Sequence, residues 1–148
     1  MRSVHLTHHS SNVTARDAYA RIGDFARYPD LVDTVRRVSV RQDAGDGVLL
    51  SDWEVDFRNG VLAWEEEDVF DDTAMTIAFR QIRGDFDTFD GRWLVTTEAS
   101  GCRVEFSAEF DFGLPTLANI VDPVAERVLR QTIGHILHAL IGGQEVAA

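Results

Sequence analysis

The hydrophobic positions of the chain repeat with a strand period over most of its length and with a helix period at two places. Residues 3–13 are of mixed polarity, as in a strand, and Thr14 is a favoured residue type for capping the helix that residues 15–25 predict. Tyr28 and Pro29 then break this helix and start a second, short one, since proline is tolerated in the first turn of a helix.

From Arg36 onward the period changes to two, which predicts a series of strands. Turn-forming residues separate the strands, most clearly at residues 43–47, at Asn59-Gly60 and at residues 113–115. Because the connections are short, consecutive strands are expected to be antiparallel neighbours. The predicted strands cover residues 36–41, 49–58, 61–70, 75–83, 86–98 and 103–112.

A long apolar helix, predicted over residues 116–141 with a bend near Pro123, follows the last strand. At about 100° per residue, its hydrophobic side chains cover well over half of the circumference, more than the stripe of a surface helix. Such a helix has to be covered on most sides, so we expect the strands to wrap around it. The predicted fold is a single α+β domain, residues 1–148, with a curved seven-stranded antiparallel sheet around the C-terminal helix and two short helices after the first strand.

Composition narrows the classes of function. The formal net charge is −11, which argues against nucleic acids and anionic membranes as partners. All 14 basic residues are arginines, so chemistry that needs a lysine Schiff base is excluded, and the single Cys102 cannot form an internal disulfide. We expect no cofactor. No apolar run is long enough to span a membrane and the N-terminus lacks the apolar core of a secretory signal, so a cytoplasmic location is predicted.

Four consecutive carboxylates, residues 65–68, stand in the predicted strand 61–70. Side chains alternate along a strand, so two of these acids face the opposite way from the other two. If Trp64 faces the helix, Glu66 and Asp68 face it as well. In the other register, Glu65 and Glu67 face the helix. An acid in an apolar interior has a raised pKa and can act as a general base or acid, whereas a twisted edge strand would leave all four acids in solvent.

Aromatic residues recur on the face of the sheet that is expected to meet the helix. Trp53, Trp64 and Trp93 lie on three strands at matching parity, a pattern typical both of a cavity for a flat or elongated ligand and of a tightly packed core. Polar residues at nominally inward positions favour the cavity, because buried polar groups without partners are costly. The candidate catalytic residues are Glu66 and Asp68, and the candidate substrate-binding residues are Tyr28, Trp53, Trp64, Phe79, Gln81, Trp93 and Thr132.

The five histidines do not predict a metal site. Within the N-terminal group only His5 and His9 share a face of the strand, and no carboxylate cluster matches them. His135, on the C-terminal helix, is a candidate for the mouth of a cavity.

Four segments carry a resemblance to a known family: residues 24–29 (DFARYP), 84–86 (GDF), 90–93 (DGRW) and 104–112 (VEFSAEFDF). Over nearly its whole length the chain resembles the polyketide cyclase/dehydrase family, which includes bacterial aromatase/cyclases and coenzyme Q-binding START-like proteins. The resemblance implies a helix-grip fold, in which a seven-stranded antiparallel sheet grips the C-terminal helix around a deep hydrophobic cavity.

Aromatase/cyclases of this family fold a poly-β-ketone chain, delivered on an acyl carrier protein, so that an enolate carbon attacks a distant carbonyl and loss of water gives an aromatic ring. The resemblance implies that Trp64 and Trp93 line the cavity. It also places Asp68 where the family has an important arginine, and Val35 where it has a cavity tyrosine. The arginine-centred mechanism therefore does not carry over, and Glu66 or Asp68 would have to supply the base.

Three functions follow as alternatives. In the first, the chain is an aromatase/cyclase of antibiotic biosynthesis, and Arg36, Arg37 and Arg41 dock an acidic carrier protein. In the second, it is a non-catalytic carrier of a quinone, lipid or other hydrophobic molecule. In the third, it is an interaction protein packed without a void. We prefer the first. The sequence leaves the oligomeric state open.

Overall fold

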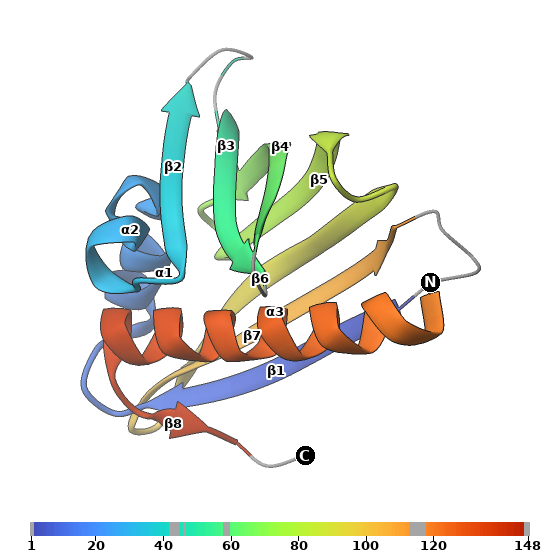
Figure 1. The fold of residues 1–148 in the computed structure, drawn as a ribbon. Coiled ribbons are helices and arrows are strands. Elements are labelled where there is room, and N and C mark those ends of the chain that lie inside the picture. The colour runs from blue at the N-terminus through green and yellow to red at the C-terminus, as the bar shows by residue number, and fades with distance from the viewer. Residues whose placement is uncertain (1, 42–44, 46, 58–59, 113–117, 147–148) are drawn as a thin grey trace.

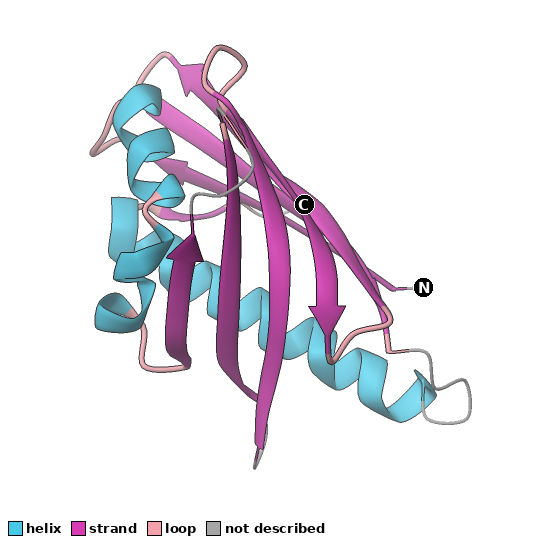
Figure 2. Ribbon diagram, turned by 90° about the horizontal axis from the view of Figure 1, so that it is seen from above, coloured by secondary structure: helices cyan, strands magenta, loops and turns pink. Residues whose placement is uncertain are grey.

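The computed structural model describes residues 2–41, 45, 47–57, 60–112 and 118–146. Two layers make up the fold: a strongly curved antiparallel sheet, and one long helix, α3 (Ala118–Ile141), that runs across the concave face of the sheet (Figure 1). Seen from above, the helix lies along one side of the sheet and the short N-terminal helices cover one end (Figure 2). The predicted α+β helix-grip architecture is confirmed.

The N-terminal part follows the sequence pattern closely. The Thr14 hydroxyl accepts a hydrogen bond of 3.1 Å from the Asp17 backbone N–H and so caps the first helix, as predicted. Pro29 lies in the first turn of a one-turn helix, where a missing N–H costs nothing. The elements are β1 (Arg2–Ser10), α1 (Ala15–Gly23), the 3-10 turn η1 (Phe25–Arg27) and α2 (Tyr28–Leu31).

The predicted meander is present, and each strand in it pairs with its neighbour in sequence. The order across the sheet is β2-β3-β4-β5-β6-β7-β1-β8, so the first strand closes the meander by pairing with β7. The predicted turns at residues 43–47, 59–60 and 113–115 include residues outside the described part of the chain. The strands are β2 (Val35–Arg41), β3 (Val48–Phe57), β4 (Gly60–Asp71), β5 (Thr76–Gly84), β6 (Thr88–Glu98) and β7 (Gly101–Asp111).

The prediction of seven strands was wrong by one, because the described residues form an eight-stranded sheet. The additional strand, β8 (Gln144–Glu145), follows the long helix and pairs with His8 and His9 of β1. Gly142 and Gly143, with φ of 65° and 76°, turn the chain back onto this edge. Two residues are too few to show a period of two, so the sequence pattern contains no signal for this strand.

Helix α3 continues through Pro123 without a break, and its predicted first residues, 116–117, lie outside the described part. None of the described helices combines the length and the apolar character that crossing a membrane requires. The side of α3 that meets the sheet is apolar except for Thr132. It buries Ala125, Leu129, Ile133, Ile136, Leu137, Leu140 and Ile141 against the sheet and the N-terminal helices.

Candidate functional site

A small cavity lies between the concave face of the sheet and α3. Its volume is about 50 Å³, enough for a few water molecules at roughly 10–15 Å³ each. Pockets that hold drug-sized ligands typically have about 300–1,000 Å³. The interior is therefore neither solid nor open, and a ligand larger than a few atoms has to displace side chains to enter.

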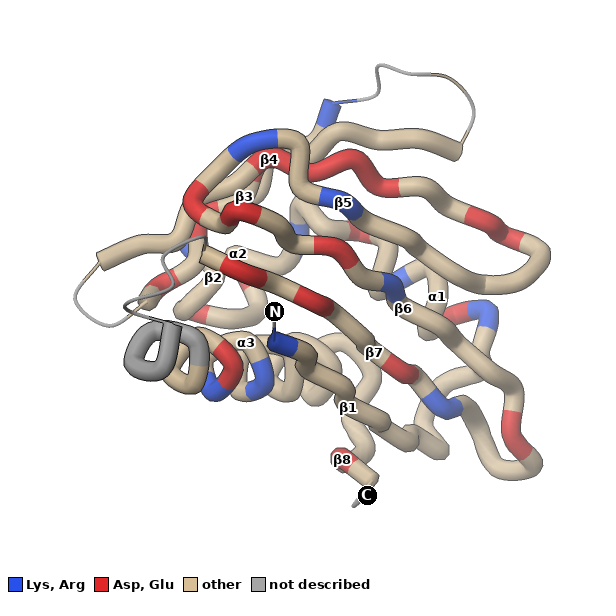
Figure 3. The backbone as a smooth tube through the Cα atoms, turned by 90° about the vertical axis from the view of Figure 1, so that its right-hand side faces the viewer, with Lys and Arg blue, Asp and Glu red and all other residues tan. Residues whose placement is uncertain are grey.

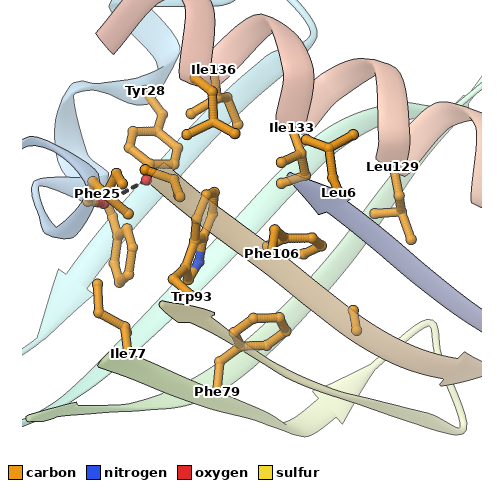
Figure 4. Close-up of a cluster of buried hydrophobic side chains, with 14 of the residues drawn as sticks. Leu6, Phe25, Tyr28, Ile77, Phe79, Trp93, Phe106, Leu129, Ile133 and Ile136 are labelled. Carbon is orange, nitrogen blue, oxygen red and sulfur yellow. Dashed lines mark hydrogen bonds between the residues drawn. The ribbon is translucent and has the colours of Figure 1, made fainter. Parts of the chain in front are cut away.

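The cavity brings together seven of the nine candidate site residues. In Figure 4, Trp93 and Phe79 lie below the side chains of α3, and Tyr28 lies to one side of them. All seven are buried, with side chains that line the cavity wall: Tyr28, Trp53, Trp64, Glu66, Phe79, Trp93 and Thr132. Asp68 is buried beside Glu66 but does not line the wall, and Gln81 lies elsewhere.

Gln81 holds the connection between β5 and β6. Its side-chain amide donates to the Phe86 carbonyl at 2.8 Å and accepts from the Phe86 N–H at 3.2 Å. Both ends of the amide thus have backbone partners, which explains a polar residue at this position without a ligand. Through these bonds Gln81 fixes Phe86, whose ring packs edge-on against Trp64 at 5.6 Å between centroids.

The register of β4 places Glu66 and Asp68 on the inner face. Trp64 pairs across the strands with Trp53, and Glu66 with Ser51, so that indoles and acids share the face that meets α3. The alternative in which all four acids are solvated is wrong, because Glu66 is 4% exposed and Asp68 is 0% exposed. The register with Trp64, Glu66 and Asp68 inside, one of the two that the sequence left open, is the one the structure has.

The two buried acids belong to a hydrogen-bond network with two tryptophans and a serine. The Trp64 indole N–H donates to Glu66 Oε1 at 2.7 Å. The Trp53 indole N–H donates to the Ser51 hydroxyl at 2.8 Å, and the Ser51 hydroxyl donates to Asp68 Oδ2 at 2.5 Å. All of these donors are neutral, so within the described part of the chain no cation pairs with Glu66 or Asp68.

Burial shifts the proton equilibria of this group. Desolvation raises the pKa of Glu66 well above its usual value, and the neighbouring Asp68 raises it further. Desolvation also raises the pKa of Asp68, although hydrogen bonds from Glu66 and Ser51 oppose this. The two carboxyl groups therefore share a proton at pH values where exposed acids have lost theirs.

Tyr28 adds a third polar group to the cavity wall, but its proton is engaged. The phenol donates to the Ile22 carbonyl at 2.5 Å, drawn as a dashed line in Figure 4. Burial, followed by the negative charges of Glu66 and Asp68, raises the pKa of Tyr28. The phenol stays neutral and holds η1 and α2 against α1.

Acidic and basic positions lie along the strands of the sheet (Figure 3), and on the outer face of β2 to β5 several arginines pair with carboxylates. Glu65 is also buried, but between Arg41 and Arg83, with Arg83 Nε 2.9 Å from Glu65 Oε1. Arg36 pairs with Asp56, and Arg37 Nη1 lies 3.5 Å from Glu54 Oε2. The three arginines that the sequence offered for docking a carrier protein thus each face a carboxylate of the sheet.

The histidines lie away from the cavity. His135 and His138 are exposed on α3, so His135 does not line the cavity wall. His8 is buried, with Nε2 2.7 Å from the Gly142 carbonyl oxygen, and His9 Nδ1 lies 2.7 Å from Glu98 Oε1. Within the described ranges, no three His, Cys, Asp or Glu side chains gather closely enough to hold a metal ion.

Sequence reasoning missed Ser51 and part of the aromatic wall. Ser51 is the one hydroxyl on the inner face of β3, between Leu49 and Trp53, and a polar residue in that apolar series was the available signal. The remaining wall residues follow from strand and helix periodicity but could not be told from ordinary core. They are Val55, Phe89, Phe106, Leu129, Ile133 and Ile136, together with Val35, which the family resemblance had already placed at a cavity position.

Comparison with known proteins agrees with this geometry. The family profile described as polyketide cyclase/dehydrase and lipid transport matches residues 11–136. A search of curated protein sequences found no match.

Several solved structures share the fold. A protein of Thermus thermophilus is 19% identical with a TM-score of 0.84, over 94% of each chain. The Zhui aromatase/cyclase from a Streptomyces species is 18% identical with a TM-score of 0.82, over 95% of this chain and 92% of its own. A START superfamily protein from Mycobacterium smegmatis is 16% identical with a TM-score of 0.76, over 95% and 94%. At such identities the likeness establishes the fold and not the activity.

Proposed function

This chain belongs to the polyketide cyclase/dehydrase and lipid transport family, and we propose that it is an aromatase/cyclase that folds a poly-β-ketone in the cavity beneath α3 and promotes its aldol cyclisation and dehydration. The observation that carries the proposal is the buried pair Glu66 and Asp68, of which Glu66 lines the cavity. A buried acid with a raised pKa can give and take a proton near neutral pH.

The acid pair supplies both proton transfers that an aldol condensation needs. Glu66 gives its proton to the carbonyl oxygen under attack as the enol carbon forms the new C–C bond, and the proton of the enol passes to the carboxylate left behind. In the dehydration, Glu66 protonates the departing hydroxyl, and the carboxylate takes a proton from the neighbouring carbon. The pair ends each step as it began, and water is the only product lost.

The aromatic walls confine the chain in a folded shape. Trp64 stacks parallel to Trp53 at an interplanar angle of 1°, and Trp93 meets Phe106 edge-on at 4.8 Å between centroids. Holding two reacting carbons together in this way replaces an entropy loss that would otherwise slow ring closure. Because the cavity of about 50 Å³ is smaller than such a substrate, its entry has to move side chains between α3 and the sheet.

The test replaces each acid by its amide. Glu66→Gln and Asp68→Asn should each lower the cyclisation rate by roughly 10²–10⁴-fold, as expected for loss of a general acid or base. The substrate is a poly-β-ketone generated in situ by a ketosynthase and its acyl carrier protein, and the cyclised products are measured by liquid chromatography with mass spectrometry.

Glu67→Gln is the matched control, because Glu67 lies on the same strand, faces outward and pairs with Arg80 at 3.4 Å. It should retain the wild-type rate. Circular dichroism checks that each variant is folded. Full activity of the Glu66→Gln/Asp68→Asn double variant would remove the acids from the mechanism.

A non-catalytic carrier is the second candidate, and the apolar character of the wall favours it. Apart from indole nitrogens, the polar side chains of the wall are those of Glu66, Tyr28 and Thr132. A carrier should copurify with a quinone or lipid detectable by mass spectrometry of organic extracts. Its ligand occupancy should be the same in the amide variants and in Glu67→Gln, and it should leave a poly-β-ketone unchanged.

A further inference from the structure

The hydrogen bonds around the two acids have a direction, and that direction distinguishes the two carboxyl groups. An indole nitrogen can only donate, so the Ser51 oxygen accepts from Trp53 over 2.8 Å. The hydroxyl hydrogen of Ser51 is then free to point at Asp68 Oδ2, which lies 2.5 Å away. Asp68 Oδ2 is the acceptor in this hydrogen bond.

The second oxygen of Asp68 is no better placed to hold a proton. Oδ1 of Asp68 is enclosed, and it has no hydrogen-bond partner in the described part of the chain. A proton on this atom would be a buried donor without an acceptor, which typically costs about 1–3 kcal/mol. Both oxygens of Asp68 thus disfavour the proton, for different reasons.

Glu66 differs from Asp68 in where it can carry a proton. Its Oε1 accepts from Trp64 over 2.7 Å, so a proton on Glu66 resides on Oε2. Glu66 is also the acid that lines the cavity, so a ligand that enters can replace Asp68 as the acceptor of the proton on Oε2. The pair is asymmetric, because Asp68 accepts from Ser51 and does not line the cavity, whereas Glu66 accepts from Trp64 and lines it.

We infer that Ser51 and Trp53 are positioning residues that hold Asp68 as the carboxylate and leave the proton of the pair on Glu66. The cavity then presents a neutral hydrogen-bond donor and selects neutral ligands with a carbonyl oxygen over ligands with a carboxylate. The inference deepens the proposed function, because it rests on ligands entering this cavity and names the polar group that they bring.

Other ionisable groups do not supply an alternative proton source. On α2, the Tyr28 phenol is committed to the Ile22 carbonyl. On β4, Glu67 faces outward and pairs with Arg80, and on β5 the residue opposite Asp68 is Phe79. Helix α3 contributes Thr132 and aliphatic side chains, so no arginine or histidine of the described chain lines the cavity wall. A ligand carboxylate would meet negative charge without a cation.

The positioning role is tested by ¹³C NMR titration of the protein labelled at Asp and Glu side-chain carboxyl carbons. Glu66→Gln and Asp68→Asn assign the two resonances. In the wild type, Asp68 should lose its proton at a lower pH than Glu66, by clearly more than the about 0.4 pH units that separate the free residues. Ser51→Ala removes the donor to Asp68 and should narrow this separation by roughly one pH unit.

Two further variants separate positioning from packing. Trp53→Phe keeps the Ser51 hydroxyl but removes the indole N–H that determines which way the hydroxyl hydrogen points. The difference between the pH values at which Asp68 and Glu66 lose their protons should therefore narrow by less than in Ser51→Ala. Ser107→Ala removes an outward hydroxyl that lies 2.8 Å from His5 Nδ1, and it should change nothing. Deprotonation of Glu66 before Asp68 in the wild type, or an unchanged separation in Ser51→Ala, would overturn the assignment.

The ligand class is tested separately with acetylnaphthalene and naphthoate, which share a ring system and differ in charge. Fluorescence titration should give at least about tenfold tighter binding of the ketone, or about 1.4 kcal/mol. Equal binding of the two, tighter binding of naphthoate, or no binding of either would overturn the ligand class. The carboxyl titration needs neither ligand nor turnover, so failure of the proposed cyclisation and failure of the positioning role give different results.

Discussion

At the scale of single residues, Glu65 and Glu66 show how one strand treats two adjacent acids differently. Both are buried, but Glu65 faces outward between Arg41 and Arg83, whereas Glu66 faces inward among indoles and apolar side chains. Guanidinium groups stabilise the charged form of the first. Desolvation penalises the charged form of the second and raises its pKa, so only Glu66 is equipped to exchange a proton with a ligand.

The raised pKa of Glu66 also makes the stability of the fold depend on pH. The unfolded chain ionises this group near its usual value of 4.5, whereas the folded chain keeps it protonated to a higher pH. Above a pH of about 4.5 the folded state binds more protons than the unfolded state, so the free energy of unfolding falls as the pH rises towards the folded pKa of Glu66. One such group contributes a slope of up to about 1.4 kcal/mol per pH unit.

Glu66→Gln should therefore flatten the decline in stability of the wild type above a pH of about 4.5. The amide keeps the bond from Trp64 but cannot ionise, so the variant should gain stability over the wild type progressively as the pH rises towards the folded pKa of Glu66. Urea unfolding at several pH values measures this. Glu67→Gln should parallel the wild type, and a parallel course for Glu66→Gln would show that Glu66 is not held protonated.

At the scale of elements, the sequence predicted those parts of the site that follow from periodicity. The alternation of Leu62, Trp64, Glu66 and Asp68 predicted a shared face, and the cross-strand pairing of Trp53 with Trp64 follows from the same parity. Which of the two faces lies inside depends on contacts with α3, which are remote in sequence. Pattern reasoning therefore left two registers open where the structure has one.

Features that depend on local backbone geometry or on remote partners were not predictable in this way. Gln81 occupies an inward-looking position, but its partner is the backbone of Phe86 beyond a bend. Ser51 acquires its role only through Asp68, which lies 17 residues further along the chain. Strand β8 depends on the two glycines that follow α3 and on the free edge of β1.

Two glycine substitutions test how α3 and β8 are built. Gly143 has a φ of 76°, and a Cβ added there would lie 2.0 Å from the His9 carbonyl oxygen. Gly143→Ala should therefore cost roughly 1–3 kcal/mol and release β8 from β1. Gly134 lies within α3, and a Cβ there would meet nothing within 4 Å, so Gly134→Ala should stabilise the protein by about 1 kcal/mol.

Thermal unfolding and amide hydrogen exchange measure these two effects. Gly143→Ala should lower the melting temperature and speed the exchange of the Val146 amide, which bonds the Thr7 carbonyl at 2.8 Å. Gly134→Ala should raise the melting temperature. Equal shifts of the same sign in both variants would contradict the account, because they would mean that glycine acts through chain entropy alone.

At the scale of the whole molecule, the sheet and α3 enclose an interior that is almost filled. Aromatic side chains from the inner faces of β3 to β7 meet aliphatic side chains of α3, and about 50 Å³ remains between them. The free energy of binding therefore includes the cost of parting the two layers. A substitution that shortens a cavity-lining side chain of α3 should lower that cost, whereas the same substitution elsewhere in the core should not.

Leu129 and Leu62 offer a matched pair for this test. Both are 5% exposed, but Leu129 lines the cavity from α3, whereas Leu62, on β4, does not line it. Truncation to alanine should cost either variant about 2–5 kcal/mol of stability. Only Leu129→Ala should tighten binding of the neutral fluorescent probe N-phenylnaphthylamine, by about tenfold, because the deleted side chain leaves room that the ligand would otherwise have to open. Equal tightening in both variants would mean that the probe reports a loosened core and that ligands do not enter between α3 and the sheet.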